Sequence, residues 1–190
     1  MPRDYVTIVS GLPRSGTSMM MKMLDAGGLV VVTDNVRTAD EDNPKGYYEF
    51  ERVKKIESDK AWLPEAHGKV VKMISALLRH LPNEYRYKVV FMRRKIEEVL
   101  ASQRQMLVRR GKPADAVSDA KMAESFAKHV RQVEAWIAAH PNVEVLYVSY
   151  NEMVENPAPH AAAIAAFLDG GLDTAKMTSV VEGELYRQRR

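Results

Sequence analysis

Residues 10–18 read SGLPRSGTS, and this stretch decides the fold of the chain. It follows an apolar run at residues 5–10, which predicts a buried strand, and it opens residues 17–26, which predict a helix. Gly11 and Gly16 have four residues between them, the spacing of a phosphate-binding loop. In such a loop, successive backbone N–H groups and the N-terminus of the helix bind an anion. The stretch therefore predicts an α/β fold with an anion site after its first strand.

The rest of the sequence continues the alternation of strand and helix. A further apolar run at residues 29–32 is a strand or a buried linker, and residues 33–48 predict a loop. The remaining predicted elements are helices at 49–59, 96–108, 114–139 and 159–168, and strands at 69–73, 87–92 and 143–148. Short, valine-rich strands flanked by helices are typical of a parallel sheet covered on both faces. We therefore expect one domain over residues 1–190, a three-layer α/β/α fold with a central parallel sheet, like that of P-loop NTPases.

Composition excludes several classes of function. The 190 residues include no cysteine, which excludes a disulfide scaffold, a thiolate zinc site and a cysteine nucleophile. The net charge of +3 is too small to indicate a nucleic-acid partner, although it suits an anionic ligand. No segment approaches the roughly 20 apolar residues of a membrane helix, and the start of the chain lacks the apolar core of a signal peptide. We expect a cytoplasmic protein with no membrane partner.

The loop departs from that of nucleotide hydrolases at one position. Thr17 stands where ATP and GTP enzymes have a lysine that contacts the β- and γ-phosphates. The nearest cation is Arg14, inside the loop. The planar guanidinium of an arginine can donate two hydrogen bonds to neighbouring oxygens of a phosphate or sulfate. The loop therefore favours an anion bound through Arg14.

Residues 13–18, together with Met-Leu at 23–24, resemble the modified P-loop of the sulfotransferase family, Pro-(Lys/Arg)-Ser-Gly-Thr-(Thr/Ser). The resemblance implies a fold of the sulfotransferase type and a loop that holds the 5′-phosphosulfate of 3′-phosphoadenosine 5′-phosphosulfate (PAPS), with 3′-phosphoadenosine 5′-phosphate (PAP) as the product. The residues to which it gives this role are Pro13, Arg14, Ser15, Gly16, Thr17 and Ser18.

A second feature resembles the same family. Arg94 follows a predicted strand, and Ser102 lies eight residues later on the next predicted helix. An arginine at the carboxyl end of a strand faces the crevice where α/β sheets bind ligands, and strand alternation directs the competing Arg93 to the opposite side. The resemblance implies that Arg94 and Ser102 bind the 3′-phosphate of the nucleotide. Residues 146–168, with an Asn-Pro break at 156–157, also resemble the family and support its fold.

Sulfuryl transfer also needs a cation at the leaving phosphate and a base for the acceptor. Arg14 meets the first need. Many relatives carry Lys-x-His after a strand, but residues 72–74 read Lys-Met-Ile, so Lys72 remains as a contact to the leaving group while the histidine is missing. Residues 43–49 resemble a segment of bacterial sulfotransferase-like proteins, which implies Glu49 as the general base. The alternative is that Glu49 is an acid at a helix start.

Other residues are weaker candidates for the chemistry or for the acceptor pocket. The candidate bases are Asp34, Asp42, His67 and His80. A basic tail at 186–190 either covers the 3′-phosphate or frays. Tyr47, Tyr48 and Trp62 are candidates for the acceptor pocket, and the alternative for Trp62 is that it packs in a small core beside Pro64. No cluster of histidines or carboxylates has metal-ligand spacing, so we expect no metal requirement.

The resemblance thus implies a PAPS-dependent sulfotransferase, and we expect it to modify a hydroxyl or amine of a small molecule, carbohydrate or peptide. One alternative is a P-loop kinase or nucleotide hydrolase, favoured by the glycine spacing, by Ser18 at the magnesium position and by the acid that ends residues 29–34. Another is a nucleotide-binding relative without activity, favoured by the missing histidine.

Overall fold

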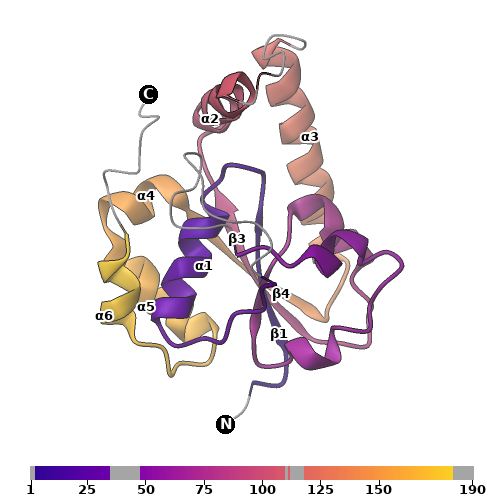
Figure 1. Cartoon of the computed structure of the whole chain (residues 1–190), viewed down its shortest axis with the longest axis vertical. Helices are drawn as coiled ribbons and strands as arrows, with labels where there is room; N and C mark the ends of the chain where they lie inside the picture. The colour runs from indigo at the N-terminus through magenta and orange to yellow at the C-terminus, as the bar shows by residue number, and fades with distance from the viewer. Residues whose placement is uncertain (1–2, 35–47, 110, 112–117, 182–190) are drawn as a thin grey trace.

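The computed structural model describes residues 3–34, 48–109, 111 and 118–181. In this part of the chain a four-stranded parallel sheet has the strand order β2-β1-β3-β4 (Figure 1). The described elements are, in chain order, β1 Val6–Gly11, α1 Thr17–Ala26, η1 Glu51–Lys55, η2 Pro64–Ala66, β2 Val70–Lys72, η3 Ser75–His80, β3 Tyr87–Arg93, α2 Ile96–Arg109, α3 Asp119–Ala138, β4 Val143–Ser149, α4 Tyr150–Glu155, α5 Pro157–Phe167 and α6 Thr174–Ser179, where η denotes a 3-10 helix.

The central strand of the sheet is β1, and all of its residues are buried. Val9 is in register with Lys72 of β2 on one side and with Val90 of β3 on the other. The chain thus leaves β1 for a neighbour on one side and later returns to its other side. In parallel sheets, ligands bind beyond the carboxyl ends of the strands at such a reversal of strand order. This topology places the loop after β1 at the expected binding edge.

The two faces of the sheet carry separate apolar clusters. Val9 and Val90 pack with side chains of α1, α4, α5 and α6, whereas Ile8 and Val89 pack with side chains of η1, η2, η3 and α3. Adjacent strand residues face opposite sides, so the alternation in each strand supplies both clusters. Figure 1 shows α1, α4, α5 and α6 gathered on one side of the strands and α3 on the other. The predicted α/β/α layering is confirmed.

Two segments differ from the sequence prediction. Residues 49–59 contain only the short 3-10 helix η1, where the N–H of Val53 donates to Phe50 O and Asp34 Oδ2 accepts from the N–H of Glu51. Residues 29–32 form a linker that touches the sheet through one bridge between Val31 and Val70. In both segments, tertiary contacts override the pattern in the sequence: Asp34 caps the start of η1, and Leu29 and Val53 pack into the buried clusters.

The elements after β3 follow the sequence prediction more closely. α2 and β4 each extend one residue beyond the predicted 96–108 and 143–148, and α3 covers 119–138 of the predicted 114–139, of which 114–117 lie outside the described residues. The sequence pattern missed η2, η3 and α6, which are six residues or shorter. No helix in the described ranges is both long and apolar enough to cross a membrane.

Candidate functional site

The loop between β1 and α1 turns sharply at the carboxyl edge of the sheet. Gly11 has φ +148°, and a Cβ there would lie 2.7 Å from Met92 O. Gly16 has φ +99°, and a Cβ there would collide with the ring of Tyr150. Arg14 has a positive φ of 69°, which is uncommon for a side-chain-bearing residue. The two glycines are therefore required by the turn and by the packing of the loop against β3 and α4.

The hydroxyl of Ser15 closes the loop from inside. Ser15 is buried, its Oγ donates to Leu12 O at 2.7 Å, and its backbone N–H donates to the same oxygen at 3.2 Å. Helix α1 then begins at Thr17, and its first turn carries no acidic residue. The first N–H groups of a helix have no partner within the helix, and its dipole favours an anion there. The predicted strand, loop and helix are thus present, and the hydrogen bonds of Ser15 to Leu12 stabilise the turn of the loop.

The side chain of Arg14 joins the loop to α2. Its Nε donates to Ser102 Oγ at 2.9 Å, and Ser102 is only 7% exposed. The resemblance implies that Arg14 binds the 5′-phosphosulfate and Ser102 the 3′-phosphate of one nucleotide, and in the structure the two side chains are in direct contact. Together they place a guanidinium and a hydroxyl beside the N-terminus of α1.

Arg94 approaches the same loop from the end of β3. Its Nη1 donates to Arg14 O at 3.1 Å, and its Nε donates to Glu98 Oε2 at 2.8 Å. Its guanidinium carbon lies 4.5 Å from the centre of the Tyr150 ring. Burial raises the pKa of Tyr150, so the cation faces a neutral aromatic ring. Arg93, in contrast, pairs with Glu134 and stacks over Tyr147, away from the loop.

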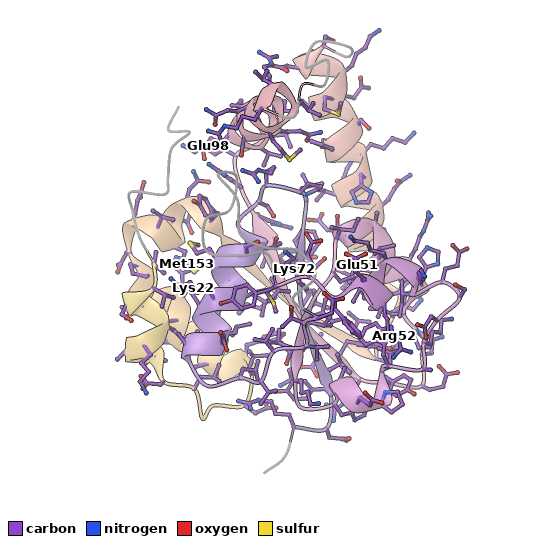
Figure 2. All side chains as sticks on the ribbon, viewed as in Figure 1. Lys22, Glu51, Arg52, Lys72, Glu98 and Met153 are labelled. Carbon is purple, nitrogen blue, oxygen red and sulfur yellow. The ribbon has the colours of Figure 1, made fainter. Side chains whose placement is uncertain are left out.

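Lys72 and Glu49 meet α1 from the other side of the loop. Lys72 Nζ lies 3.4 Å from Ser18 Oγ and 3.9 Å from Glu49 Oε1. Glu49 Oε2 lies 3.5 Å from Lys54 Nζ, so its carboxylate is set between two ammonium groups. The side chains of Lys72 and Glu49 are largely buried, with exposed fractions of 12% and 17%. Figure 2 shows Lys72 beside α1, between Lys22 and Glu51 in this view.

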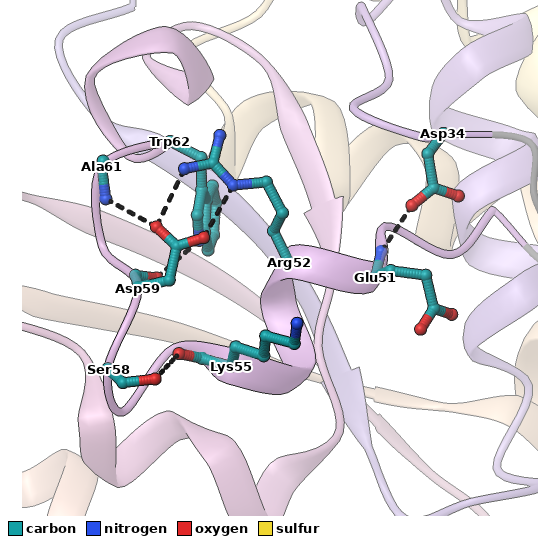
Figure 3. A network of polar contacts seen from close by, with 8 residues as sticks. All are labelled: Asp34, Glu51, Arg52, Lys55, Ser58, Asp59, Ala61 and Trp62. Atoms are coloured by element: carbon teal, nitrogen blue, oxygen red, sulfur yellow. Dashed lines mark hydrogen bonds and ion pairs between the residues drawn. The ribbon is translucent and has the colours of Figure 1, made fainter.

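The weaker candidates have other contacts. Asp34 accepts from the backbone of Glu51 at the start of η1 (Figure 3). His67 packs edge-on against Tyr85, and His80 accepts from Arg79. Their roles as bases stay predictions. Asp42, Tyr47 and the tail at 186–190 lie outside the described residues.

Two of the aromatic candidates for a pocket, Tyr48 and Trp62, lie among the described residues. Trp62 is 2% exposed, and its Nε1 donates to the backbone of Asp59, whose carboxylate pairs with Arg52 (Figure 3). Trp62 thus belongs to a buried apolar cluster, as expected from the alternative that it is a core residue. Tyr48 donates to Asp25 on α1.

Sequence reasoning missed several residues of the site. Glu98 lies four residues after Arg94, and this spacing of an acid and an arginine could have indicated that they pair. Tyr150 and Asn151 are the first residues of α4, the helix after β4. His129 of α3 was not singled out either, and its Nε2 lies 2.8 Å from Oγ of Ser75, a residue of η3 three positions after Lys72. Within the described residues, no group of three or more histidines and carboxylates is placed to hold a metal ion.

Comparison with solved structures shows the same fold in two sulfotransferases. The crystal structure of mouse sulfotransferase SULT7A1 complexed with PAP matches with a TM-score of 0.57 at 17% identity, over 94% of this chain and 62% of that one. The sulfotransferase domain from the curacin biosynthetic pathway matches with a TM-score of 0.57 at 14% identity, over 97% of this chain and 80% of that one. This chain therefore spans less than two thirds of the mouse protein.

Comparison of the sequence with individual curated proteins gave no match. A family model described as a sulfotransferase domain, however, matches residues 4–186. The matched region contains the loop, Lys72, Arg94 and Ser102, and both structural neighbours are sulfotransferases. The chain belongs to the sulfotransferase domain family.

Proposed function

We propose that this chain is a PAPS-dependent sulfotransferase that transfers the sulfuryl group to a hydroxyl or an amine. The observation that carries the proposal is the contact between Arg14 Nε and Ser102 Oγ. This contact joins the loop implied to hold the 5′-phosphosulfate to the helix implied to hold the 3′-phosphate. The mouse relative with the same fold was solved with PAP, which supports a nucleotide of this type.

The donor set of the site fits an anionic nucleotide. Arg14 and Lys72 supply cationic donors, Ser18 and Ser102 supply hydroxyls, and α1 supplies the N–H groups of its first turn. Bound PAPS would supply the sulfuryl group. Arg14 and Lys72 would stabilise the negative charge that develops on the oxygen between sulfur and the 5′-phosphate as their bond breaks. Pro13, Ser15, Gly16 and Thr17 would hold the loop and present its backbone.

Glu49 is the proposed general base. It would accept the proton of the attacking hydroxyl or amine while the acceptor atom bonds to sulfur. Its position supports this role, because Lys72 bridges Glu49 and Ser18 and so joins the carboxylate to the nucleotide loop.

The contact between Lys72 and Ser18 also argues against the alternative of a P-loop kinase. In P-loop kinases, the hydroxyl at the position of Ser18 coordinates Mg²⁺. In this chain, an ammonium group lies 3.4 Å from that hydroxyl. A cation already set beside Ser18 disfavours a second cation there and favours a reaction without magnesium.

Thermal unfolding with added nucleotide tests the proposal. A ligand at one hundred times its dissociation constant adds about 2.7 kcal/mol of stability, which raises the melting temperature by roughly 5–10 °C for a chain of this size. We expect this rise with PAP, whether or not magnesium is present. A rise only with magnesium and ATP would replace the proposal with a kinase or hydrolase. PAP binding without transfer from PAPS to any hydroxyl or amine would indicate an inactive relative.

A further inference from the structure

A buried carboxylate lies next to the nucleotide loop. Glu98, in the first turn of α2, has no exposed surface (labelled in Figure 2). Its Oε2 accepts from Arg94 Nε at 2.8 Å, and its Oε1 accepts from Asn151 Nδ2 at 2.8 Å. Burial of a carboxylate is costly unless it is paired and hydrogen-bonded, and here both oxygens are engaged.

The partners of Glu98 are themselves fixed. Asn151 Oδ1 accepts from the N–H of Lys95 at 3.3 Å, so the amide spans from the start of α2 to the start of α4. The guanidinium of Arg94 rests on the ring of Tyr150 and donates to Arg14 O. Arg94 is thus held by a carboxylate, an aromatic face and the backbone of the loop.

The orientation of Arg94 matters because a guanidinium is planar. Its donors match two oxygens of a phosphate only when the plane of the fork is correctly turned. A hydrogen bond at Nε fixes that plane, since Nε lies where the flexible side chain meets the fork. A general need for stability would not require this arrangement, because apolar side chains of similar volume often replace a buried ion pair without loss.

We propose that Glu98 is a positioning residue that, with Asn151, orients Arg94 for the 3′-phosphate of the nucleotide. This inference rests on the proposed function. Glu98 contacts no substrate, and it acts by holding the fork of Arg94 in one plane. Its removal therefore weakens the part of nucleotide affinity that depends on the 3′-phosphate and spares the part that depends on the loop.

Calorimetric titration of Glu98→Gln with PAP and with 5′-AMP, which lacks the 3′-phosphate, tests the proposal. A glutamine side chain has one carbonyl oxygen and one amide NH2 group, so either Arg94 or Asn151 loses its acceptor. We expect PAP affinity to fall about tenfold, as for a lost charge-assisted hydrogen bond, and 5′-AMP affinity to change less than about twofold. Glu97→Gln is the matched control, since this neighbour makes the same charge change on the exposed face of α2 and should leave both affinities unchanged.

Asn151→Ala gives a second test that keeps the charge of Glu98. It should lower the preference for PAP over 5′-AMP in the same direction, by about threefold, as for a neutral hydrogen bond. This variant decides the matter if Glu98→Gln does not fold, as judged by its thermal unfolding transition.

The remaining outcomes overturn the proposal. Higher PAP affinity in Glu98→Gln would show that the carboxylate only competes with the phosphate for Arg94. If both variants keep the wild-type preference for PAP over 5′-AMP, or lose affinity for the two ligands equally, Glu98 has only a structural role. The proposed function fails separately if the wild-type protein binds PAP no better than 5′-AMP, and the role of Glu98 then fails with it.

Discussion

The Nε atom of Arg14 lies 2.9 Å from the Oγ atom of Ser102, although 88 positions separate the two residues in the sequence. Arg94 makes the complementary connection, because it donates to the backbone oxygen of Arg14. The loop after β1 and the start of α2 are therefore connected by hydrogen bonds in both directions. A nucleotide with phosphates on both the 3′- and the 5′-oxygen of its ribose would contact two segments that are already linked.

Arg14→Ala should weaken PAP binding by about tenfold to a hundredfold, because it removes a charged donor that can contact two oxygens. The measurement is calorimetric titration with PAP. Arg86→Ala is the matched control, since Arg86 precedes β3 at the opposite edge of the sheet and pairs with Asp4 and Glu144. Unchanged affinity in Arg14→Ala, with the protein folded, would remove the loop from the binding site.

Ser102→Ala should show that the loop after β1 and helix α2 contribute jointly to PAP affinity. In a double-mutant cycle with Arg14→Ala, the losses of PAP affinity should fall short of additivity by about threefold to tenfold, because the two side chains share one hydrogen bond. Ser58→Ala, at an exposed serine whose hydroxyl bonds within its own turn, is the control and should be additive. Additive losses for Ser102 and Arg14 would contradict a shared site.

Combining Ser102→Ala with Arg94→Ala tests the 3′-phosphate role directly. PAP affinity should fall much more than 5′-AMP affinity, because only PAP carries the phosphate that these residues are proposed to bind. The readout is the ratio of the two dissociation constants against that of the wild type. A ratio that stays constant while both affinities fall would leave Arg94 and Ser102 without this role.

The strand, loop and helix around Gly11 and Gly16 could be predicted because their signals are local. An apolar run, two glycines at fixed spacing and a helix start all lie within about twenty residues. The family resemblance added Arg94 and Ser102 as partners in one site. Their direct connections to Arg14 required the strand order, since β3 carries Arg94 to the edge where β1 ends.

Glu98 shows why part of the site could not be predicted. An acid in the first turn of a helix is usually solvated and favoured by the dipole, so its sequence position gave no reason to expect full burial. Glu98 is nevertheless buried, and one of its partners, Asn151 at the start of α4, lies 53 positions away in the sequence. The short elements η2, η3 and α6 were missed for a related reason, because tertiary contacts rather than periodicity stabilise them.

Gly16→Ala should lower the free energy of unfolding by about 2–4 kcal/mol, from left-handed strain and from overpacking against Tyr150. Gly28→Ala is the matched control, because Gly28 has a similar φ of +93° and no atom within 4 Å of an added Cβ. It should lose only about 1–2 kcal/mol from strain. Denaturant unfolding measures both values. Equal losses would mean that the ring of Tyr150 moves aside and does not fix the loop.

Glu49→Gln should abolish sulfuryl transfer and leave PAP affinity within about threefold of the wild type. The substitution keeps the size of the side chain but removes the group that would accept the proton of the acceptor. Transfer is measured with sulfur-labelled PAPS and a panel of hydroxyl and amine acceptors. Glu51→Gln is the matched control, because Glu51 is more exposed and pairs with Lys54, as Glu49 does, and transfer should persist.

The outcome for Glu49 also separates the two steps of the proposed chemistry. Loss of transfer with normal PAP binding would place the proton acceptor at Glu49, whereas loss of both would mean that Glu49 serves mainly to hold Lys72 near Ser18. Full activity would exclude Glu49 as the base. His129 would then be the next candidate base. Its Nε2 lies 2.8 Å from Oγ of Ser75, and Ser75 follows Lys72 by three positions. Burial lowers the pKa of His129, which keeps the imidazole neutral and able to accept a proton near pH 7.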